Sequence, residues 1–155
     1  MELVRSNLVR NALESQGMVA ILKRTVPPLD KTLLRASRGW INTGLQPVVL
    51  LETTGAKTGQ VRTIATLCMP VGRDIVLVGS NWGQERDPAW IHNLRANPEC
   101  RITFRCFVGD VSARELKGRE RTVMWQHLLR FNPQYGRYQE LTSRQLPVML
   151  LTRGD

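Results

Sequence analysis

The chain has few of the residues on which metal centres and nucleophilic active sites depend. Among its 155 residues are three cysteines and two histidines, His92 and His127. Neither histidine stands at a metal-ligand spacing from the other or from a cysteine, and neither has a matched acid within sequence reach. Ser80 lacks the glycines two residues before and two residues after it that a nucleophile elbow needs. The sequence therefore indicates neither a metal site nor a serine triad.

Cysteine pairing and long hydrophobic runs are also missing, and both bear on the compartment. The odd number of cysteines, without a pairing pattern, favours a reducing cytoplasm, with Cys100 and Cys106 as small core or surface residues. No apolar run approaches the length that spans a bilayer. Arg5 and Arg10 interrupt the first apolar residues, which is unlike a signal peptide. These features predict a cytoplasmic protein.

Positive charge is what the chain has in excess. Its net charge is +9 and its pI about 10.5, a balance that favours nucleic acid, an acidic lipid surface or a polyanionic small molecule as partner. The arginines are scattered from Arg5 to Arg153, whereas nucleic-acid binders gather them on one helix or stripe. Aromatic residues make up only 6% of the chain, which leaves little material for base stacking. We therefore expect no nucleic-acid partner.

The N-terminal quarter, residues 1–45, is expected to be a helical segment. Apolar residues recur among basic ones over residues 1–26, without one clean apolar face. Pro27-Pro28 stops that stretch, and Asp30 to Arg38 is typical of a second short helix. Residues 1–26 could dock on the body, which is the commoner outcome, or make peripheral contact with a membrane through their basic side chains.

Residues 46–155 are expected to form a mainly β domain with helices, of class α+β. Asp87-Pro88 is a strong helix start, in which Asp87 would cap the free N–H groups. Two further helices are expected, one over Gly118–Phe131 with Val123, Leu128 and Leu129 facing inward, and a turn over Tyr135–Leu141. About six short antiparallel strands, closing into a barrel with helices at its ends, fit better than βαβ units. The strands are expected at Val48–Thr54, Val61–Met69, Ile75–Val78, Cys100–Phe107, Val108–Glu115 and Pro147–Thr152.

Two loops could bind a ligand, although each has a simpler interpretation. The hairpin from Gly55 to Gln60 offers backbone N–H groups and the Thr58 hydroxyl, and Lys57 and Arg62 add charge, so it could hold an anion. From the local sequence alone, a solvated β-turn with a surface lysine is the commoner case. Gly79 would permit close approach of a flat ring after the third strand, with Ser80 and Asn81 bonding its edges. That loop could also be a plain strand exit.

Taken together, the motifs resemble the deazaflavin-dependent nitroreductase family, whose members use coenzyme F420, an 8-hydroxy-5-deazaflavin. The resemblance covers residues 48–152 and rests on three blocks in the family's order: LLETTGAKTGQVRT, SNWGQERDPAWIHNLRANP, and NPQYGRYQ before LPVMLLTR. It implies a split β-barrel related to flavin-mononucleotide-binding oxidoreductases.

The resemblance also implies roles for individual residues. Positions matching the phosphate and acidic-tail contacts are Lys57, Thr58, Gly59 and Arg62. Those lining the deazaflavin and its linker are Ala65, Ser80 and Asn81, and those of the covering helix are Ala89, Trp90 and Asn93. The substrate-side positions are Ser80, Tyr135 and Tyr138. Departures are Ala65 for a common proline, Trp82 for a common second glycine, and Asn132 for an aromatic residue.

The function that the resemblance implies is hydride transfer from reduced F420 to a small acceptor, such as a quinone, an activated alkene or a nitro compound. Ser80, Tyr135 or water would protonate the product. Two alternatives stay open, an enzyme that uses flavin mononucleotide and a non-catalytic carrier of a fatty acid or another apolar ligand. Related split barrels are often dimers, and the nitroreductase branch includes monomers, so the resemblance implies either a monomer or a homodimer.

Overall fold

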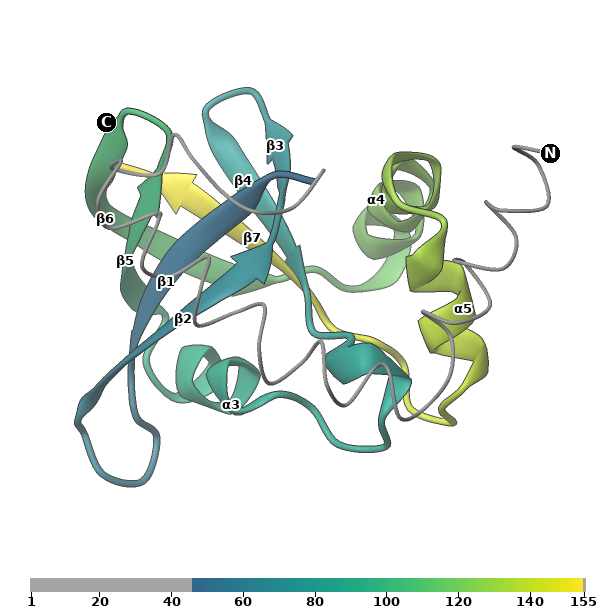
Figure 1. Ribbon diagram of the computed structural model, residues 1–155, viewed down its shortest axis with the longest axis horizontal. Coiled ribbons are helices and arrows are strands. Elements are labelled where there is room, and N and C mark those ends of the chain that lie inside the picture. The colour runs from purple at the N-terminus through teal and green to yellow at the C-terminus, as the bar shows by residue number, and fades with distance from the viewer. Residues whose placement is uncertain (1–45, 155) are drawn as a thin grey trace, which may run out of the picture.

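The computed structural model describes residues 46–154 (Figure 1). The segment 1–45, on which the predictions of docking or membrane contact fall, lies outside the described residues. Seven antiparallel strands form one sheet in the order β2-β1-β5-β6-β7-β4-β3. The strands are β1 (Val48–Thr54), β2 (Val61–Leu67), β3 (Met69–Val71), β4 (Asp74–Val78), β5 (Glu99–Phe104), β6 (Phe107–Glu115) and β7 (Val148–Arg153).

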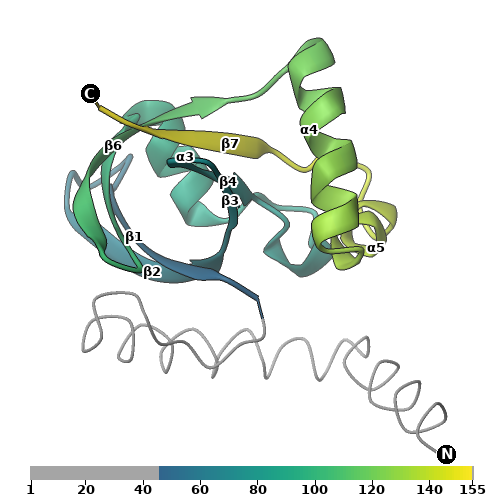
Figure 2. The same ribbon diagram turned by 90° about the horizontal axis from the view of Figure 1, so that it is seen from above.

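The sheet curls, and its two outer strands, β2 and β3, follow one another along the chain. Only Cys68 separates β2 from β3, so the first and last strands of the order are one bent segment of chain. Figure 2 shows the strands curving round together. The predicted barrel of about six antiparallel strands is confirmed, with the predicted strand 61–69 divided at Cys68. Leu67 pairs with Val48 of β1, whereas Met69 pairs with Val76 of β4.

Strand β4 is buried on both faces, as its continuous apolar run predicts. Ile75 and Leu77 belong to the core inside the curled sheet, together with residues of β1, β5 and helix α3. Val76 and Val78 belong to a second core, which contains residues of helices α4 and α5. The end of β4 therefore lies between the two cores, and the loop that follows it starts from a rigid position.

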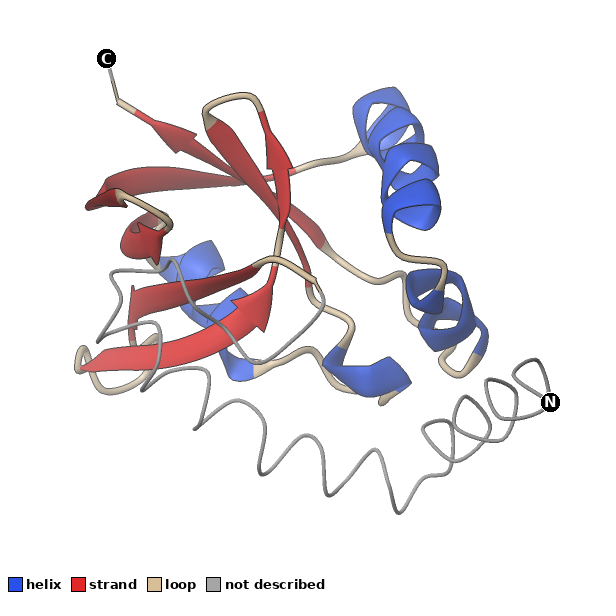
Figure 3. Ribbon diagram, turned by 45° about the horizontal axis from the view of Figure 1, so that its top comes forward, coloured by secondary structure: helices blue, strands red, loops and turns tan. Residues whose placement is uncertain are grey.

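The helices are α3 (Ala89–Ala96), α4 (Gly118–Phe131) and α5 (Gln134–Glu140), with a short 3-10 turn, η1 (Asn81–Gly83). Figure 3 shows α4 and α5 together on one side of the strands, apart from α3. Trp90, Ile91 and Leu94 are the apolar residues that α3 buries. No helix among residues 46–154 is long and apolar enough to cross a membrane.

Three local predictions are wrong. Val123 is 51% exposed, because the buried face of α4 carries Arg121 and Leu128, and position 123 is about 200° of helix rotation from Arg121. The turn between β5 and β6 lies at Arg105-Cys106 rather than at Phe107-Val108, and no glycine or proline marks it. Asp87 does not cap α3, whose N-cap residue is Pro88 without a side-chain cap.

The cysteines occupy ordinary structural positions. Burial raises the pKa of the Cys68 thiol to about 12, and it raises that of the Cys100 thiol to about 12 as well. Both thiols are therefore protonated core groups near neutral pH. Cys106 is exposed at the turn between β5 and β6. The expectation of small core or surface residues is confirmed for both Cys100 and Cys106.

Gly79 is required by close packing where β4 meets α3. A Cβ built there would lie 2.7 Å from Ile91 Cγ1 and 2.9 Å from Pro147 Cγ. We predict that Gly79→Ala lowers the free energy of unfolding by about 1–3 kcal/mol, because the added methyl overpacks the core. Urea titration measures this. Gly154→Ala is the matched control, since a Cβ there meets no atom within 4 Å. Equal effects of the two changes would contradict the packing role.

Candidate functional site

Two hollows lie side by side around β2. The inner cavity has a volume of about 360 Å³ and lies between β2, the end of β4, η1 and α5. The hairpin groove has a volume of about 740 Å³ and lies between the 55–60 hairpin, β2 and α3. Ile64 and Trp90 line both. The two hollows therefore adjoin, and together they form an elongated site.

The structure brings most of the predicted site residues into these hollows. The inner cavity contains Ala65, Ser80, Asn81, Trp90, Tyr135 and Tyr138. The hairpin groove contains Lys57, Thr58, Arg62, Ala89, Trp90 and Asn93. Gly59 and Gly79 are not lining residues of either hollow. Gly59 adopts a φ of 69° in the hairpin turn, which suits glycine, and the small size of Gly79 is used by core packing.

The hairpin loop is closed by its own backbone. The Gly55 N–H donates to the Gln60 carbonyl at 2.8 Å, and the Gly59 N–H donates to the Gly55 carbonyl at 2.9 Å. The Thr58 hydroxyl accepts from the Gln60 N–H at 3.3 Å. Lys57 and Arg62 are exposed beside the groove. Lys57 of the loop and Arg62 of β2 thus present two cationic side chains beside the groove. The hydroxyl proton of Thr58 remains available to an anion.

Asn93 ties this hairpin to α3. Its Oδ1 accepts from the Ala56 N–H at 2.9 Å, and its Nδ2 donates to Thr53 Oγ1 at 3.0 Å. The side chain is buried, at 8% exposure. Both ends of the amide therefore have partners within the protein. Its geometry is that of an anchor that sets the distance between the hairpin and the helix across the groove.

The loop after β4 has an unusual backbone. Asn81, Trp82 and Gly83 have successive φ values of 45°, 59° and 75°. Glycine adopts this left-handed region freely and asparagine tolerates it, but tryptophan rarely does. The Gly83 N–H donates to the Ser80 carbonyl at 2.8 Å, and Asn81 Nδ2 donates to the Arg86 carbonyl at 2.8 Å. A run of such residues persists only where the surroundings fix it.

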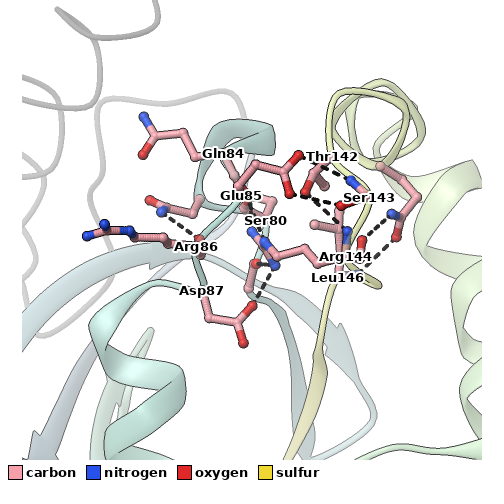
Figure 4. A network of polar contacts seen from close by, with 12 residues as sticks. Ser80, Gln84, Glu85, Arg86, Asp87, Thr142, Ser143, Arg144 and Leu146 are labelled. Carbon is pink, nitrogen blue, oxygen red and sulfur yellow. Dashed lines mark hydrogen bonds and ion pairs between the residues drawn. The ribbon is translucent and has the colours of Figure 1, made fainter.

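Arg144 supplies that fixation (Figure 4). Its Nη1 donates to the Gly79 carbonyl at 3.1 Å and its Nη2 to the Ser80 carbonyl at 2.9 Å, both before the left-handed turn. Its Nε donates to the Gln84 carbonyl at 2.8 Å, after the turn. Nη1 also pairs with Asp87 Oδ1 at 2.6 Å. We refer to this set of contacts as the Arg144 clamp.

The clamp continues into a chain of ion pairs. Asp87 also pairs with Arg95 at 2.8 Å, and Arg95 pairs with Glu115 at 2.8 Å. The hydrogen bonds from Arg95, with its positive charge, lower the pKa of Glu115. Asp87 thus bridges two arginines from α3 and from the segment before β7, which explains why it does not cap the helix. The loop between β4 and α3 is therefore attached, through Asp87, both to α3 and to the segment before β7.

Glu85 makes a second attachment of the same loop. Its carboxylate accepts from the Ser143 N–H at 3.2 Å and from the Ser143 hydroxyl at 3.1 Å. The backbone hydrogen bond from Ser143 is the main cause that lowers the pKa of Glu85. Sequence reasoning missed both Glu85 and Arg144. Glu85 is 58 positions from its partner Ser143, and Arg144 is 57 positions from its partner Asp87. No local motif marks pairs so far apart in the sequence.

The two tyrosines of α5 differ in environment. Tyr135 is buried, at 3% exposure, and burial raises the pKa of its phenol above the usual value. The phenol therefore keeps its proton throughout the physiological pH range. Tyr138 is half-buried, and its ring meets the Trp82 ring edge-on, with centroids 6.0 Å apart and planes at 71°. Among residues 46–154 no cluster of three histidine, cysteine, aspartate or glutamate side chains could hold a metal ion.

We predict that Arg144→Met lowers the free energy of unfolding by about 2–4 kcal/mol, because three carbonyls and Asp87 lose a donor in a mostly buried place. The free energy of unfolding of Arg144→Lys should lie between those of the wild type and Arg144→Met, since an ammonium cannot bridge all four acceptors at once. Chemical denaturation measures both changes. Arg130→Met, on the exposed side of α4, is the control and should change stability by less than about 0.5 kcal/mol. A clamp variant that matched the control would contradict the assignment.

Comparison of the sequence with protein families finds one match. The model of the F420H(2)-dependent quinone reductase family matches residues 30–153. An F420H(2)-dependent quinone reductase of Mycobacterium tuberculosis H37Rv is 36% identical over 131 residues, which cover 81% of this chain and 88% of that protein.

Solved structures resemble the fold as well. A structure of an F420-H2 dependent reductase (FDR-A) is 35% identical, with a TM-score of 0.62, and the match covers 68% of this chain and 93% of that one. A structure described as a domain-swapped dimer is 31% identical, with a TM-score of 0.65, and covers 78% of this chain and 93% of that one. Both matches agree with the split barrel that the sequence predicts.

Proposed function

The chain belongs to the F420H(2)-dependent quinone reductase family, and we propose that it reduces a quinone with the reduced form of the deazaflavin coenzyme F420. The observation that carries this proposal is the continuity of the two hollows. One is walled by apolar and aromatic residues and the other is bordered by cationic side chains, and Ile64 and Trp90 are common to both. Such a site suits one long ligand with a flat ring at one end and acid groups at the other.

The donor set fits that coenzyme. Lys57 and Arg62 provide two positive charges, and the Thr58 hydroxyl provides a neutral donor, for a phosphate and an acidic tail. Ala65 and Trp90 provide apolar walls for a ring, and Ser80 and Asn81 provide polar groups at its edge. The net charge of +9 would attract the polyanionic tail from a distance.

The coenzyme supplies a hydride to the quinone when it is bound, and one proton added to the quinone oxygen completes the hydroquinone. The residues of this chain would orient the partners and manage that proton. The Arg144 clamp would hold Ser80 beside the ring. Ser80, Tyr135 or water would deliver the proton, and the raised pKa of Tyr135 keeps its phenol in the donor form. Walls with few polar groups would exclude competing water.

An activated alkene or a nitro compound would accept a hydride in the same position, and either remains a second acceptor class for this site. Flavin mononucleotide is a less favoured coenzyme, since the family that the chain belongs to is named for F420. The relative described as a domain-swapped dimer supports a homodimer as the assembly of this chain, alongside the monomer.

We predict that Lys57→Ala combined with Arg62→Ala weakens binding of coenzyme F420 by about 100-fold, because two charge-assisted contacts are lost. Titration by fluorescence or calorimetry measures the dissociation constant. The matched control is Arg73→Ala with Arg130→Ala, which removes the same charge from exposed positions outside both hollows. The control should change the constant by less than about threefold, because distant charges are screened by salt.

Equal weakening by the two double variants would mean that net charge, and not the groove, attracts the coenzyme. Unchanged affinity in the Lys57 and Arg62 variant would overturn the proposed position of the tail. Tight binding without reduction of either menadione or the single-ring 2,3-dimethyl-1,4-benzoquinone would favour a carrier over a reductase. A protein that is yellow as purified would favour flavin mononucleotide.

We predict that Tyr135→Phe lowers kcat by about tenfold or more if its phenol is the proton donor, and leaves coenzyme affinity unchanged. Burial raises the pKa of this phenol above the ordinary tyrosine value of about 10. The phenol therefore keeps its proton at every pH up to about 10. The pH profile of kcat should thus show no loss from Tyr135 up to about pH 10. A decline between pH 7 and 9 that disappears in the Phe variant would contradict the assigned protonation state.

A further inference from the structure

We propose that Trp82 determines the size of the acceptor that this protein reduces, by closing the acceptor side of the inner cavity with its indole ring. The inference rests on the proposed function and names a specificity-determining residue for it. Trp82 lines the inner cavity together with Ser80 and both tyrosines of α5. These three residues are the ones that the family resemblance assigns to the substrate side.

The first support is the backbone of Trp82. Its φ of 59° lies in the left-handed region, where a bulky side chain is strained and a glycine is not. Nothing in the turn itself requires a side chain at this position, since the Ser80–Gly83 hydrogen bond is made by backbone atoms. A strained residue that the turn does not need is a candidate for a functional role, because such residues concentrate at functional sites.

The second support is that the structure fixes the backbone of the turn and places one aromatic ring against the indole. The Arg144 clamp fixes the carbonyls of Ser80 before the turn and Gln84 after it. A Cβ at Gly83 would lie 3.0 Å from Leu141 side-chain atoms and 3.0 Å from the Tyr138 carbonyl, so the turn is pressed against α5. The Tyr138 ring meets the indole edge-on at 6.0 Å. The turn cannot swing outward without breaking these contacts.

The third support is the limited space. The inner cavity, at about 360 Å³, is near the lower end of the range of about 300–1,000 Å³ for ligand pockets. It has to receive both the coenzyme ring and the acceptor. With the indole in the wall, the cavity favours acceptors with a single ring, whereas a glycine at position 82 would leave room for a second fused ring.

The test compares two quinones across variants. Wild type and Trp82→Gly are assayed with reduced F420 and with 2,3-dimethyl-1,4-benzoquinone or menadione, and the ratio of kcat/KM for menadione to kcat/KM for the benzoquinone is taken for each protein. Dividing the variant's ratio by that of the wild type cancels the intrinsic reactivities of the quinones. We expect this quotient to be about tenfold or more, the range that pocket size commonly provides. Trp82→Phe should give an intermediate value.

Two readouts separate this role from a structural one. The coenzyme dissociation constant should change by less than twofold in Trp82→Gly, because the tail is held in the hairpin groove. Thermal unfolding should remain one cooperative transition, since the Arg144 clamp that fixes the turn is intact in this variant. Trp125→Phe, on α4 outside both hollows, is the control for loss of an indole and should leave the quinone ratio unchanged.

A quotient within twofold of one would overturn the proposal, as would a parallel loss of both activities with weakened coenzyme binding, which would show that Trp82 contacts the coenzyme. If wild type binds the coenzyme but reduces neither quinone, the proposed function itself fails, and the acceptor role of Trp82 fails with it. The two failures are distinguished by the wild-type assay alone.

Discussion

The Arg144 guanidinium holds the segment that forms one wall of the inner cavity, and the site depends on this contact. Three backbone carbonyls, those of Gly79, Ser80 and Gln84, accept hydrogen bonds from it, and Asp87 balances its charge. Carbonyls on both sides of a left-handed turn are thereby fixed. A tryptophan can occupy such a turn only because its surroundings leave no alternative. The shape of the cavity thus follows from a residue far along the chain, close to the last strand.

Local patterning was sufficient to predict the fold. Alternating or continuous apolar runs located the strands, and the double burial of β4 followed from its unbroken run of Ile75 to Val78. The predictions failed where tertiary contacts decide. Cys68 divides a strand because its two neighbours pair with different strands, β1 and β4. Val123 faces solvent because the buried face of α4 includes Arg121, which a pattern of apolar residues does not reveal.

The residues that line the site could be predicted from the sequence, but the contacts that hold them in place could not. The sequence indicated which loops carry polar and cationic groups. The structure brings eleven of the thirteen predicted site residues into two joined hollows around Ile64 and Trp90, and only Gly59 and Gly79 lie outside them. The internal anchors could not be predicted. Asn93 holds the hairpin through Ala56 and Thr53, which lie 37 and 40 positions away. Such pairs arise from the closure of the barrel and carry no local signature.

The central claim is that a single ligand occupies both hollows. NMR titration of the backbone amides with coenzyme F420, and with a deazaflavin that lacks the phosphate and acidic tail, tests it most directly. We predict that the full coenzyme shifts the amides of residues 57–59 and 80–82 together, with one dissociation constant, and that the ligand without the tail shifts only residues 80–82. A full coenzyme that perturbs only one of these two sets would contradict the account.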